Sequence, residues 1–178
     1  MTEKKMMMMK IRKIQVKDVP TLRKNIFDRC TDEQLHEMLK GFSNEIETPG
    51  KKIMLVAIIS RITGDDGGDD DDAGEVIGCA QLERGSSPLT KHRAEIESVV
   101  VKEGMRRKGI CRSMLDACEE ESRRVGLKSL VITCRGGEPP EIIYQRCGFT
   151  ICGRIPRGLM DSESGQTWDE VILHKPLL

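Results

Sequence analysis

The sequence predicts one α/β (α+β) domain, with a mixed central sheet of about six to seven strands flanked by about four helices. A chain of 178 residues is long enough for one domain with a sizeable core. Apolar runs of strand length alternate with amphipathic runs of helix length. In chain order these runs read strand, two helices, three strands, helix, strand, helix and two strands, and this order carries the prediction of the fold.

Composition excludes several classes of protein before any motif is considered. Hydrophobic residues make up 38% of the chain and charged residues 33%, as in soluble globular proteins. Lysine plus arginine and aspartate plus glutamate number 29 each, so the basic excess of a general nucleic-acid binder is absent. Aromatic residues are only 3%, which also argues against base-stacking surfaces. We therefore expect no nucleic-acid partner.

Localisation and domain boundaries follow from the apolar runs and the cysteines. No apolar run is long enough to span a bilayer, and residues 1–9 lack the cleavage pattern of a signal peptide. The seven cysteines contain no Cys-x-x-Cys pair, which indicates reduced thiols rather than a zinc site or a disulfide framework. We therefore predict a cytoplasmic protein without a metal or a membrane contact. Residues 1–9 are expected to be a disordered N-terminal segment, and residues 10–178 a single domain.

The N-terminal half reads as a strand followed by two helices. Residues 10–17 alternate between apolar and polar side chains, as a half-buried strand does. Asp18 is a suitable N-cap for the first helix. Thr31, with Gln34 three residues later, predicts a capping box at the start of the second.

The nearly continuous apolar run of residues 52–62 predicts a strand that is buried on both faces, and residues 76–82 are a second candidate strand. Between them, residues 63–75 carry six aspartates among glycines, which repel one another and have nothing to bury. A flexible acidic loop is the interpretation that we favour. A calcium loop is the alternative, but no helix precedes it and the glutamate that an EF-hand needs is out of register.

Residues 91–101 predict a central strand that opens polar and ends apolar. A period of two places Glu95, Glu97, Val99 and Val101 on one side of it. Carboxylates in a central strand need a wet cleft or a partner, because a buried unpaired charge is costly. The strand is therefore expected to border a cleft or to hold its carboxylates beside a partner.

The basic turn that follows, residues 103–113, is the main candidate for a binding site in the sequence. It opens an amphipathic helix that runs to Val125, and the first N–H groups of a helix have no partner inside it. Together with the helix dipole, these N–H groups make the turn an anion site. Gly109 lets a ligand approach the backbone closely. The remaining elements are a buried strand (127–134), a short helix (141–146) and two strands (149–155 and 167–175).

Arg106-x-x-Gly109-x-Cys111 resembles the Gln/Arg-x-x-Gly-x-Gly/Ala signature with which GCN5-related N-acetyltransferases (GNAT) hold the pyrophosphate of acetyl-CoA. The order of elements is also that of the GNAT fold. Residues 144–149 look like the Tyr-x-x-x-Gly-Phe element of the family's last helix, and residues 92–95 and 153–156 look closest to its tabtoxin-resistance branch. The resemblance covers residues 91–178 well, and the N-terminal half only in the order of its elements.

The resemblance implies an N-acetyltransferase that moves an acetyl group directly from acetyl-CoA to a primary amine of a small molecule in a ternary complex. Tyr144 would be the acid, with Glu95 as the first candidate for the base and Glu97 as the second. The residues expected to hold acetyl-CoA are Val99, Val100, Val101, Arg106, Arg107, Lys108, Gly109, Ile110, Cys111, Arg112 and Ser113.

Three departures from the family pattern leave the identity of the base open. Cys111 stands where glycine or alanine is usual, Thr133 stands where the branch has an aspartate, and residues 138–140 stand where the family often has an asparagine. Glu95 and Glu97 could instead be surface carboxylates paired with nearby cations, and Tyr144 could serve packing alone.

Other functions use the same scaffold. A protein lysine or N-terminal acetyltransferase is one alternative, and a catalytically silent acetyl-CoA-binding module is another. A homodimer is among the oligomeric states that the sequence leaves open.

Overall fold

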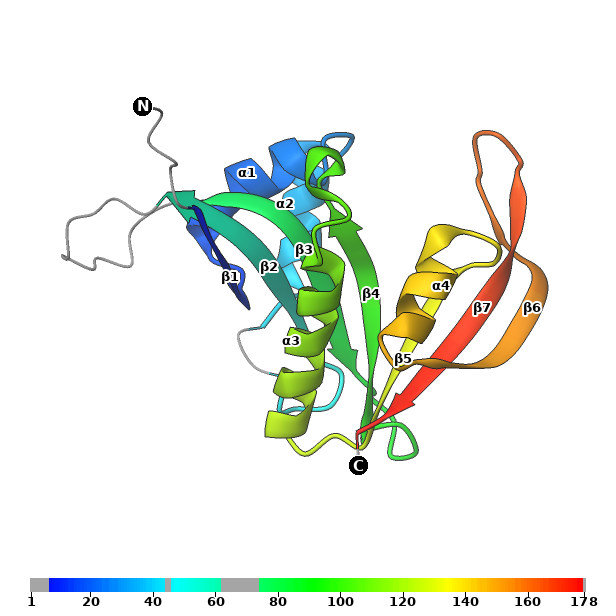
Figure 1. The fold of residues 1–178 in the computed structure, drawn as a ribbon. Helices are drawn as coiled ribbons and strands as arrows, with labels where there is room; N and C mark the ends of the chain where they lie inside the picture. Colours follow the sequence, from blue (N-terminus) through cyan, green and yellow to red (C-terminus); the bar gives the residue numbers. More distant parts are fainter. Residues whose placement is uncertain (1–6, 44–45, 62–73, 178) are drawn as a thin grey trace.

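The computed structural model describes residues 7–43, 46–61 and 74–177. Its core is a seven-stranded sheet in the order β1-β2-β3-β4-β5-β7-β6 (Figure 1). Strands β4 and β5 pair parallel, and the other neighbouring strands pair antiparallel. The strands are β1 (Met7–Lys13), β2 (Lys52–Arg61), β3 (Glu75–Arg84), β4 (Arg93–Val101), β5 (Ser129–Arg135), β6 (Thr150–Met160) and β7 (Thr167–Pro176).

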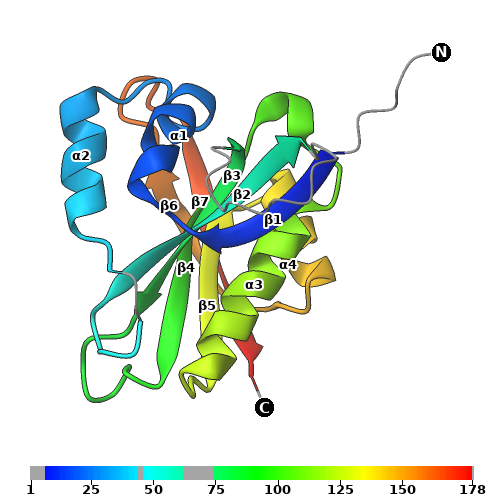
Figure 2. The same cartoon turned by 90° about the vertical axis from the view of Figure 1, so that its left-hand side faces the viewer.

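Helices cover both faces of the sheet. They are α1 (Val19–Asn25), α2 (Asp32–Lys40), α3 (Ile110–Arg124) and α4 (Pro139–Arg146), with short 3₁₀ turns η1 (Val16–Asp18) and η2 (Glu103–Met105). Figure 2 shows α1 and α2 on one side of the sheet and α3 and α4 on the other. The predicted mixed α/β architecture and its order of elements are confirmed.

The sheet separates two apolar cores, and β2 contributes to both. Ile53, Leu55 and Ala57 belong to the core beneath α3, whereas Met54 and Val56 pack with α1 and α2. Side chains alternate across a strand, so a strand buried on both faces must be apolar throughout. This is the physical basis of the continuous apolar run in its sequence.

The N-terminal strand lies earlier in the chain than the sequence suggested. Strand β1 begins at Met7, so residues 7–9 are extended and paired with β2, although the sequence predicted disorder through residue 9. The strand ends at Lys13, because residues 16–18 form the turn η1. Residues 1–6 lie outside the described part of the chain.

Asp18 occupies the predicted N-cap position of α1, but its side chain makes no capping hydrogen bond to the helix. Its carboxylate is buried, with its Oδ2 2.6 Å from Arg12 Nη1, and it accepts the N–H of Gln15 at 2.7 Å. A charged, two-pronged pair of this kind is stronger than a cap bond, which explains the difference. The capping box at α2 is confirmed: Gln34 N–H donates to Thr31 Oγ1 at 3.2 Å, and Thr31 N–H donates to Gln34 Oε1 at 2.8 Å.

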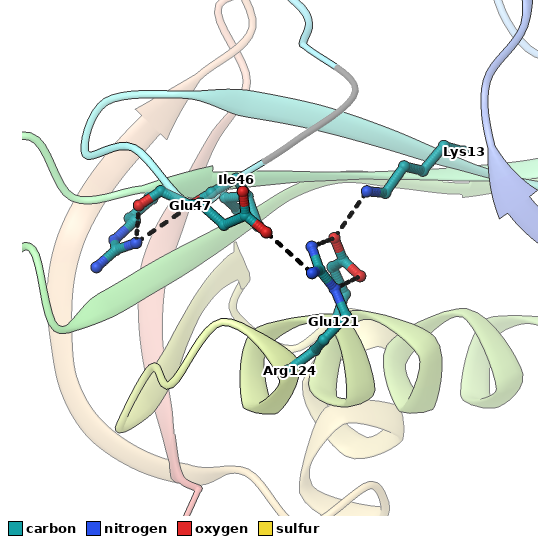
Figure 3. A network of polar contacts seen from close by, with 6 residues as sticks. Lys13, Ile46, Glu47, Glu121 and Arg124 are labelled. Atoms are coloured by element: carbon teal, nitrogen blue, oxygen red, sulfur yellow. Dashed lines mark hydrogen bonds and ion pairs between the residues drawn. The ribbon is translucent and has the colours of Figure 1, made fainter.

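A polar network fixes α3 across the sheet (Figure 3). Glu121 of α3 lies 2.9 Å from Lys13 Nζ at the end of β1 and 3.0 Å from Arg124 Nε. Arg124 also donates to the carboxylate of Glu47 at 2.9 Å, and Arg84 of β3 donates to the Glu47 carbonyl. The C-terminal half of α3 is therefore tied to β1, to β3 and to the segment before β2.

The predicted acidic loop, residues 63–75, lies largely outside the described residues. Gly74 and Glu75 are described, and Glu75 opens β3. The loop's flexibility stays a prediction.

Candidate functional site

Strands β4 and β5 separate part-way along their length. Their parallel pairing runs from Arg93 opposite Ser129 to Ile96 opposite Ile132 and stops there, although both strands continue. Figure 1 shows the two strands together at one end and divergent at the other. We call this divergence the split. Beyond Ile96, no strand in the described part of the chain pairs with the edge of β4 that faces β5, so an extended ligand could pair with it.

A β-bulge in β4 accounts for the split. Val100 pairs with Cys79 of β3 and Glu97 pairs with Gln81, so β4 has one residue more than β3 between these pairs. Ser98 lies in this bulge with a left-handed φ of 50°, and its carbonyl accepts the Cys79 thiol at 3.6 Å. Bulges bend and twist a strand, which here turns β4 away from β5.

The bulge also corrects the predicted sides of β4. The sequence placed Glu95, Glu97, Val99 and Val101 together, and this is wrong. Val99 and Val101 pack against the core beneath α3, whereas the two glutamates alternate with core residues and lie on the opposite face. One extra residue shifts a period of two by one position, which exchanges the faces.

The start of α3 is left uncapped. Gly109 is its N-cap, with φ of 81° and no capping side chain, and the first helical bond runs from Ser113 N–H to Gly109 O at 3.0 Å. The six N–H groups of residues 107–112 donate to no acceptor in the described part of the chain. A Cβ at Gly109 would meet no atom within 4 Å. The turn therefore offers backbone N–H donors beside open space, as an anion requires.

Four basic side chains around this turn are exposed: Arg106, Arg107, Lys108 and Arg112. None of them forms an ion pair with a described carboxylate, so their charges are available to a ligand. Arg106 Nε also donates to the carbonyl of Val101 at 3.2 Å, which ties the turn to the end of β4. Ile110 was also predicted to hold acetyl-CoA, but its side chain is buried in the core, so only its backbone N–H can face an anion.

Cys111 adds no negative charge to the anion site. Its thiol is partly buried, and burial raises its pKa to about 11, with Cys147 acting in the same direction. A neutral thiol is the dominant form at neutral pH. The departure from the family signature at this position is therefore compatible with a bound phosphate.

Tyr144 of α4 lies close to the start of α3. Its side chain is buried, with its ring 6.4 Å from that of Phe149 at 54°. Burial raises its pKa, and so do the neighbouring thiols of Cys111, Cys134 and Cys147. Its hydroxyl forms no hydrogen bond within the described residues, so its proton is available to a ligand.

Two contacts fix α4 and thereby Tyr144. Glu141, one turn earlier, accepts the N–H of Gly137 at 2.9 Å and forms an ion pair with Arg154 of β6. Both contacts lower the pKa of Glu141. The start of α4 is therefore tied to the preceding loop and to the neighbouring strand.

The two candidate bases lie half-buried on the face opposite α3. Burial raises the pKa of Glu95, and the charges of Glu97, Glu83 and Glu170 act in the same direction. Arg93 lowers this pKa through its field but forms no ion pair with Glu95 in the described structure. Glu95 is therefore a carboxylate that binds a proton more readily than usual.

Sequence reasoning missed four polar residues of this face: Lys52 of β2, Gln81 and Glu83 of β3, and Glu170 of β7. Gln81 and Glu83 pair in register with Glu97 and Glu95. They are polar positions at the end of an otherwise apolar strand, and this is the signal that could have found them. Nothing in the sequence indicates that β7 comes near β4.

Across the described ranges, no three potential metal ligands come together. None of the helices in these ranges has the length and apolar character that crossing a membrane requires. A cavity of about 660 Å³ lies between η1–α1 and α2, lined by Val16, Val19, Asp32, Glu33, Leu35, His36, Leu39 and Lys40. None of these residues is on β4, β5, α3 or α4.

The chain matches known proteins in sequence and in structure. Residues 62–149 match the model of the acetyltransferase (GNAT) family. No curated protein matches the chain. A GNAT-family acetyltransferase from Streptococcus pneumoniae superposes with a TM-score of 0.71 at 18% identity, over 95% of this chain and 99% of that one.

Two further solved structures share the fold. A protein assigned as a phosphinothricin N-acetyltransferase superposes with a TM-score of 0.72 at 20% identity, over 96% of this chain and 99% of that one. A chimeric spermidine N-acetyltransferase from Vibrio cholerae and hSSAT has a TM-score of 0.72 at 13% identity, over 95% of both chains. Identities this low establish the fold alone, and the family model adds the sequence match. The chain belongs to the GNAT superfamily and is an acetyltransferase.

Proposed function

We propose that the protein transfers an acetyl group from acetyl-CoA to a primary amine of a small molecule within a ternary complex. One observation carries the proposal: the uncapped start of α3 follows directly on the strand whose edge at the split is unpaired. A pyrophosphate needs N–H donors and positive charge, and a pantetheine arm needs a free strand edge. Both requirements are met side by side.

The residues present fit acetyl-CoA. The N–H groups of residues 107–112 and the exposed basic side chains around them would hold the pyrophosphate. The edge of β4 at residues 99–101 would pair with the pantetheine arm, which brings the thioester to the split. The N–H of Val99 would donate a hydrogen bond to the thioester oxygen.

The acceptor amine would approach from the opposite face, where Glu95 and Glu97 lie. An amine is mostly protonated at neutral pH and must lose a proton before it can attack. Glu95 is the better base, because burial and like charges raise its pKa toward the operating range. Glu97 lies nearer the split and is the second candidate.

Acetyl-CoA supplies an activated acetyl group: a C–N bond to the acceptor forms and the C–S bond breaks. The ammonium group loses one proton to Glu95, directly or through water, before it attacks, and the nitrogen loses a second proton by the same route as the C–N bond forms; Glu95 passes each proton to solvent. Tyr144 donates its hydroxyl proton toward the sulfur and regains one from solvent. Because the raised pKa of Tyr144 lies above that of a thiol, its hydroxyl first donates a hydrogen bond to the leaving sulfur, before the proton is transferred.

A small-molecule acceptor is the choice that the likenesses favour. Residues 92–95 and 153–156 resemble the tabtoxin-resistance branch, and the similar structures include enzymes named for phosphinothricin and for spermidine. Under the proposal, Thr133 has no role as the base, since the two glutamates lie on the acceptor side of β4.

Calorimetry with acetyl-CoA and a thioester-cleavage assay with small amines test the proposal. Binding of acetyl-CoA and acetylation of at least one small amine, detected by mass spectrometry, are the expected results. Tight binding without turnover on any amine or peptide would indicate a silent module. Turnover on lysine peptides alone would indicate a protein acetyltransferase.

A further inference from the structure

The protein carries one of its own amines on the face of the sheet where the acceptor would lie. Lys52 opens β2, and Met54, two residues later, packs in the core beneath α1 and α2. Residues two apart on a strand point to the same side. The side chain of Lys52 therefore lies on the face opposite α3, which also carries Glu95 and Glu97.

The strand register and the ion pairs bring the Lys52 amine close to β4. Lys52 pairs with Glu83 of β3, and Glu83 pairs with Glu95 of β4, so one row of residues crosses the three strands. The Lys52 Nζ lies 2.5 Å from a carboxylate oxygen of Glu83 and 3.8 Å from one of Glu97. Since Glu97 follows Glu95 on β4, the lysine leans from its own row toward the split.

The Lys52 amine is within reach of the reaction centre of the proposed function. Val99, whose N–H would face the thioester oxygen, follows Glu97 by two residues, about 7 Å along a strand. A lysine side chain is a flexible four-carbon stem with a compact ammonium head. That of Lys52 is 37% exposed, so part of it borders solvent and is not held by packing. Rotation about its carbon–carbon bonds can therefore carry the nitrogen to the thioester.

The surroundings of Lys52 distinguish a catalysed acetylation from a spontaneous one. The hydrogen bond to Glu83 raises the pKa of Lys52, and the charge of Glu97 acts in the same direction, although burial opposes them. A higher pKa leaves less of the neutral amine, so a spontaneous reaction with acetyl-CoA would favour other lysines. A catalysed reaction would favour Lys52, because Glu97, a candidate base, lies beside its ammonium group.

We infer that the protein acetylates its own Lys52. The inference rests on the proposed function, with the Lys52 amine in the place of the acceptor. The ammonium group loses a proton to Glu97, and the neutral nitrogen attacks the thioester carbon. A C–N bond forms, the C–S bond breaks, and the nitrogen loses a second proton by the same route. Glu97 passes both protons to solvent, and the leaving sulfur takes one proton from Tyr144.

Acetylation of Lys52 would change the charge of the acceptor side of the split. The amide that forms carries no charge, so Glu83 and Glu97 would lose the ammonium group that lies beside both of them. Neighbouring carboxylates without a cation repel one another and bind protons more readily. The modification therefore makes the surface on which an acceptor would bind more negative.

Mass spectrometry of the whole protein after incubation with acetyl-CoA alone tests the inference. We expect one acetyl group per chain, and peptide sequencing should place it on Lys52. The rate constant should not depend on protein concentration, because the acetyl-CoA and the lysine are held by the same molecule. Protein unfolded in urea should show no preference for Lys52. A folded protein whose Lys52 reacts no faster than its other lysines would overturn the inference, and so would a rate constant that rises with protein concentration.

Three variants locate the reaction. Lys52→Arg keeps a cation beside Glu83 and removes the reactive amine, so the acetyl group should be lost; its persistence would contradict the assignment. Lys51→Arg changes the exposed neighbour that precedes β2 and should leave acetylation of Lys52 unchanged. Tyr144→Phe should slow acetylation of Lys52 by about 100-fold, as for lost acid catalysis. An unchanged rate in Tyr144→Phe would mean that the reaction is spontaneous.

Calorimetry distinguishes failure of the proposed function from failure of this inference. If acetyl-CoA does not bind, both fail. If acetyl-CoA binds and a small amine is acetylated while Lys52 stays unmodified, only the inference of self-acetylation fails.

Discussion

The two sides of the split offer different chemistry to a ligand. On the side of α3, the donors are backbone N–H groups of one continuous stretch, residues 107–112. On the opposite side, the polar groups are side chains from β3, β4 and β7 that meet only in the folded sheet. Backbone N–H donors suit a part of the ligand that does not vary, such as a cofactor phosphate. Side-chain groups can be changed by substitution without altering the backbone, so they suit a part of the ligand that varies. An enzyme with an invariant cofactor and a variable acceptor needs one binding surface of each kind.

Tyr144 would act where the cofactor side and the acceptor side of the split meet. Its replacement is expected to have the largest effect on turnover. Tyr144→Phe removes the hydroxyl and keeps the ring that packs against Phe149. We expect turnover to fall by about 100-fold or more, in the range of lost general-acid catalysis. Acetyl-CoA affinity should stay within about twofold, because the hydroxyl holds neither the pyrophosphate nor the pantetheine arm. Steady-state thioester cleavage and calorimetry measure the two quantities, and unchanged turnover would remove the acid role.

Gly109 tests the backbone side. Valine cannot hold the left-handed φ of 81° without strain, so Gly109→Val should move the turn and misplace its N–H donors. We expect acetyl-CoA affinity to fall on the order of 10- to 100-fold, as for one or two lost charge-assisted hydrogen bonds.

Gly104 provides the matched control for this prediction. It lies in the same basic segment, a Cβ there would meet no atom within 4 Å, and its φ is not left-handed. Gly104→Ala should therefore leave acetyl-CoA affinity unchanged in the same calorimetric titration. Equal losses in both variants would mean that the segment, and not the conformation of Gly109, determines binding.

The comparison also explains how much the sequence could predict. The anion site was predictable because its glycine, its basic residues and its helix start are contiguous, so local rules describe it. The order of elements was predictable because β2 is a continuous apolar run and α3 has a clear helical period over its whole length. Glu95 and Glu97 lie on β4, in the strand that the sequence predicted. The sequence wrongly placed them on the same face of the sheet as Val99 and Val101.

The failure at β4 has one physical cause. The bulge at Ser98 depends on how β4 pairs with β3, and serine gives no local sign of a left-handed φ, as glycine would. The polar residues of β3 and β7 on the same face as Glu95 and Glu97 were missed for a related reason. Gln81 and Glu170 are far apart in the sequence, and only the strand order brings their strands to the two sides of β4 and β5.

The pH dependence of turnover tests the side-chain half of the comparison. Since the pKa of Glu95 is raised, the acidic limb of kcat/KM should lie above the ordinary carboxyl value of 4.5. Glu97→Gln removes a like charge and should move this limb to lower pH, and Glu95→Gln should abolish it. Glu120→Gln, at an exposed position of α3, is the control and should leave the profile unchanged. A limb that persists in Glu95→Gln would assign the base to another group.

Stability should depend on Glu95 with a definite sign. A carboxyl whose pKa is higher in the folded state binds a proton more tightly there than in the unfolded chain. The free energy of unfolding then falls as pH rises from the unfolded value of 4.5 through the raised folded value. Glu95→Gln should flatten this slope and be relatively more stable at neutral pH, which urea unfolding at several pH values would measure. A steeper slope in the variant would contradict the direction of the shift.

The smallest effect is expected at α2, whose start is the capped counterpart of α3. Thr31 and Gln34 satisfy each other's backbone N–H groups, and the first turn carries the carboxylates of Asp32 and Glu33, so this helix start does not suit an anion. Thr31→Ala should lower the free energy of unfolding by about 1 kcal/mol, seen as a lower urea midpoint with the same m-value. Acetyl-CoA affinity should not change, because the cap lies on the other side of the sheet from α3. If the variant lost affinity instead, the helix starts on the two faces would not be independent, and the division between a backbone side and a side-chain side would fail.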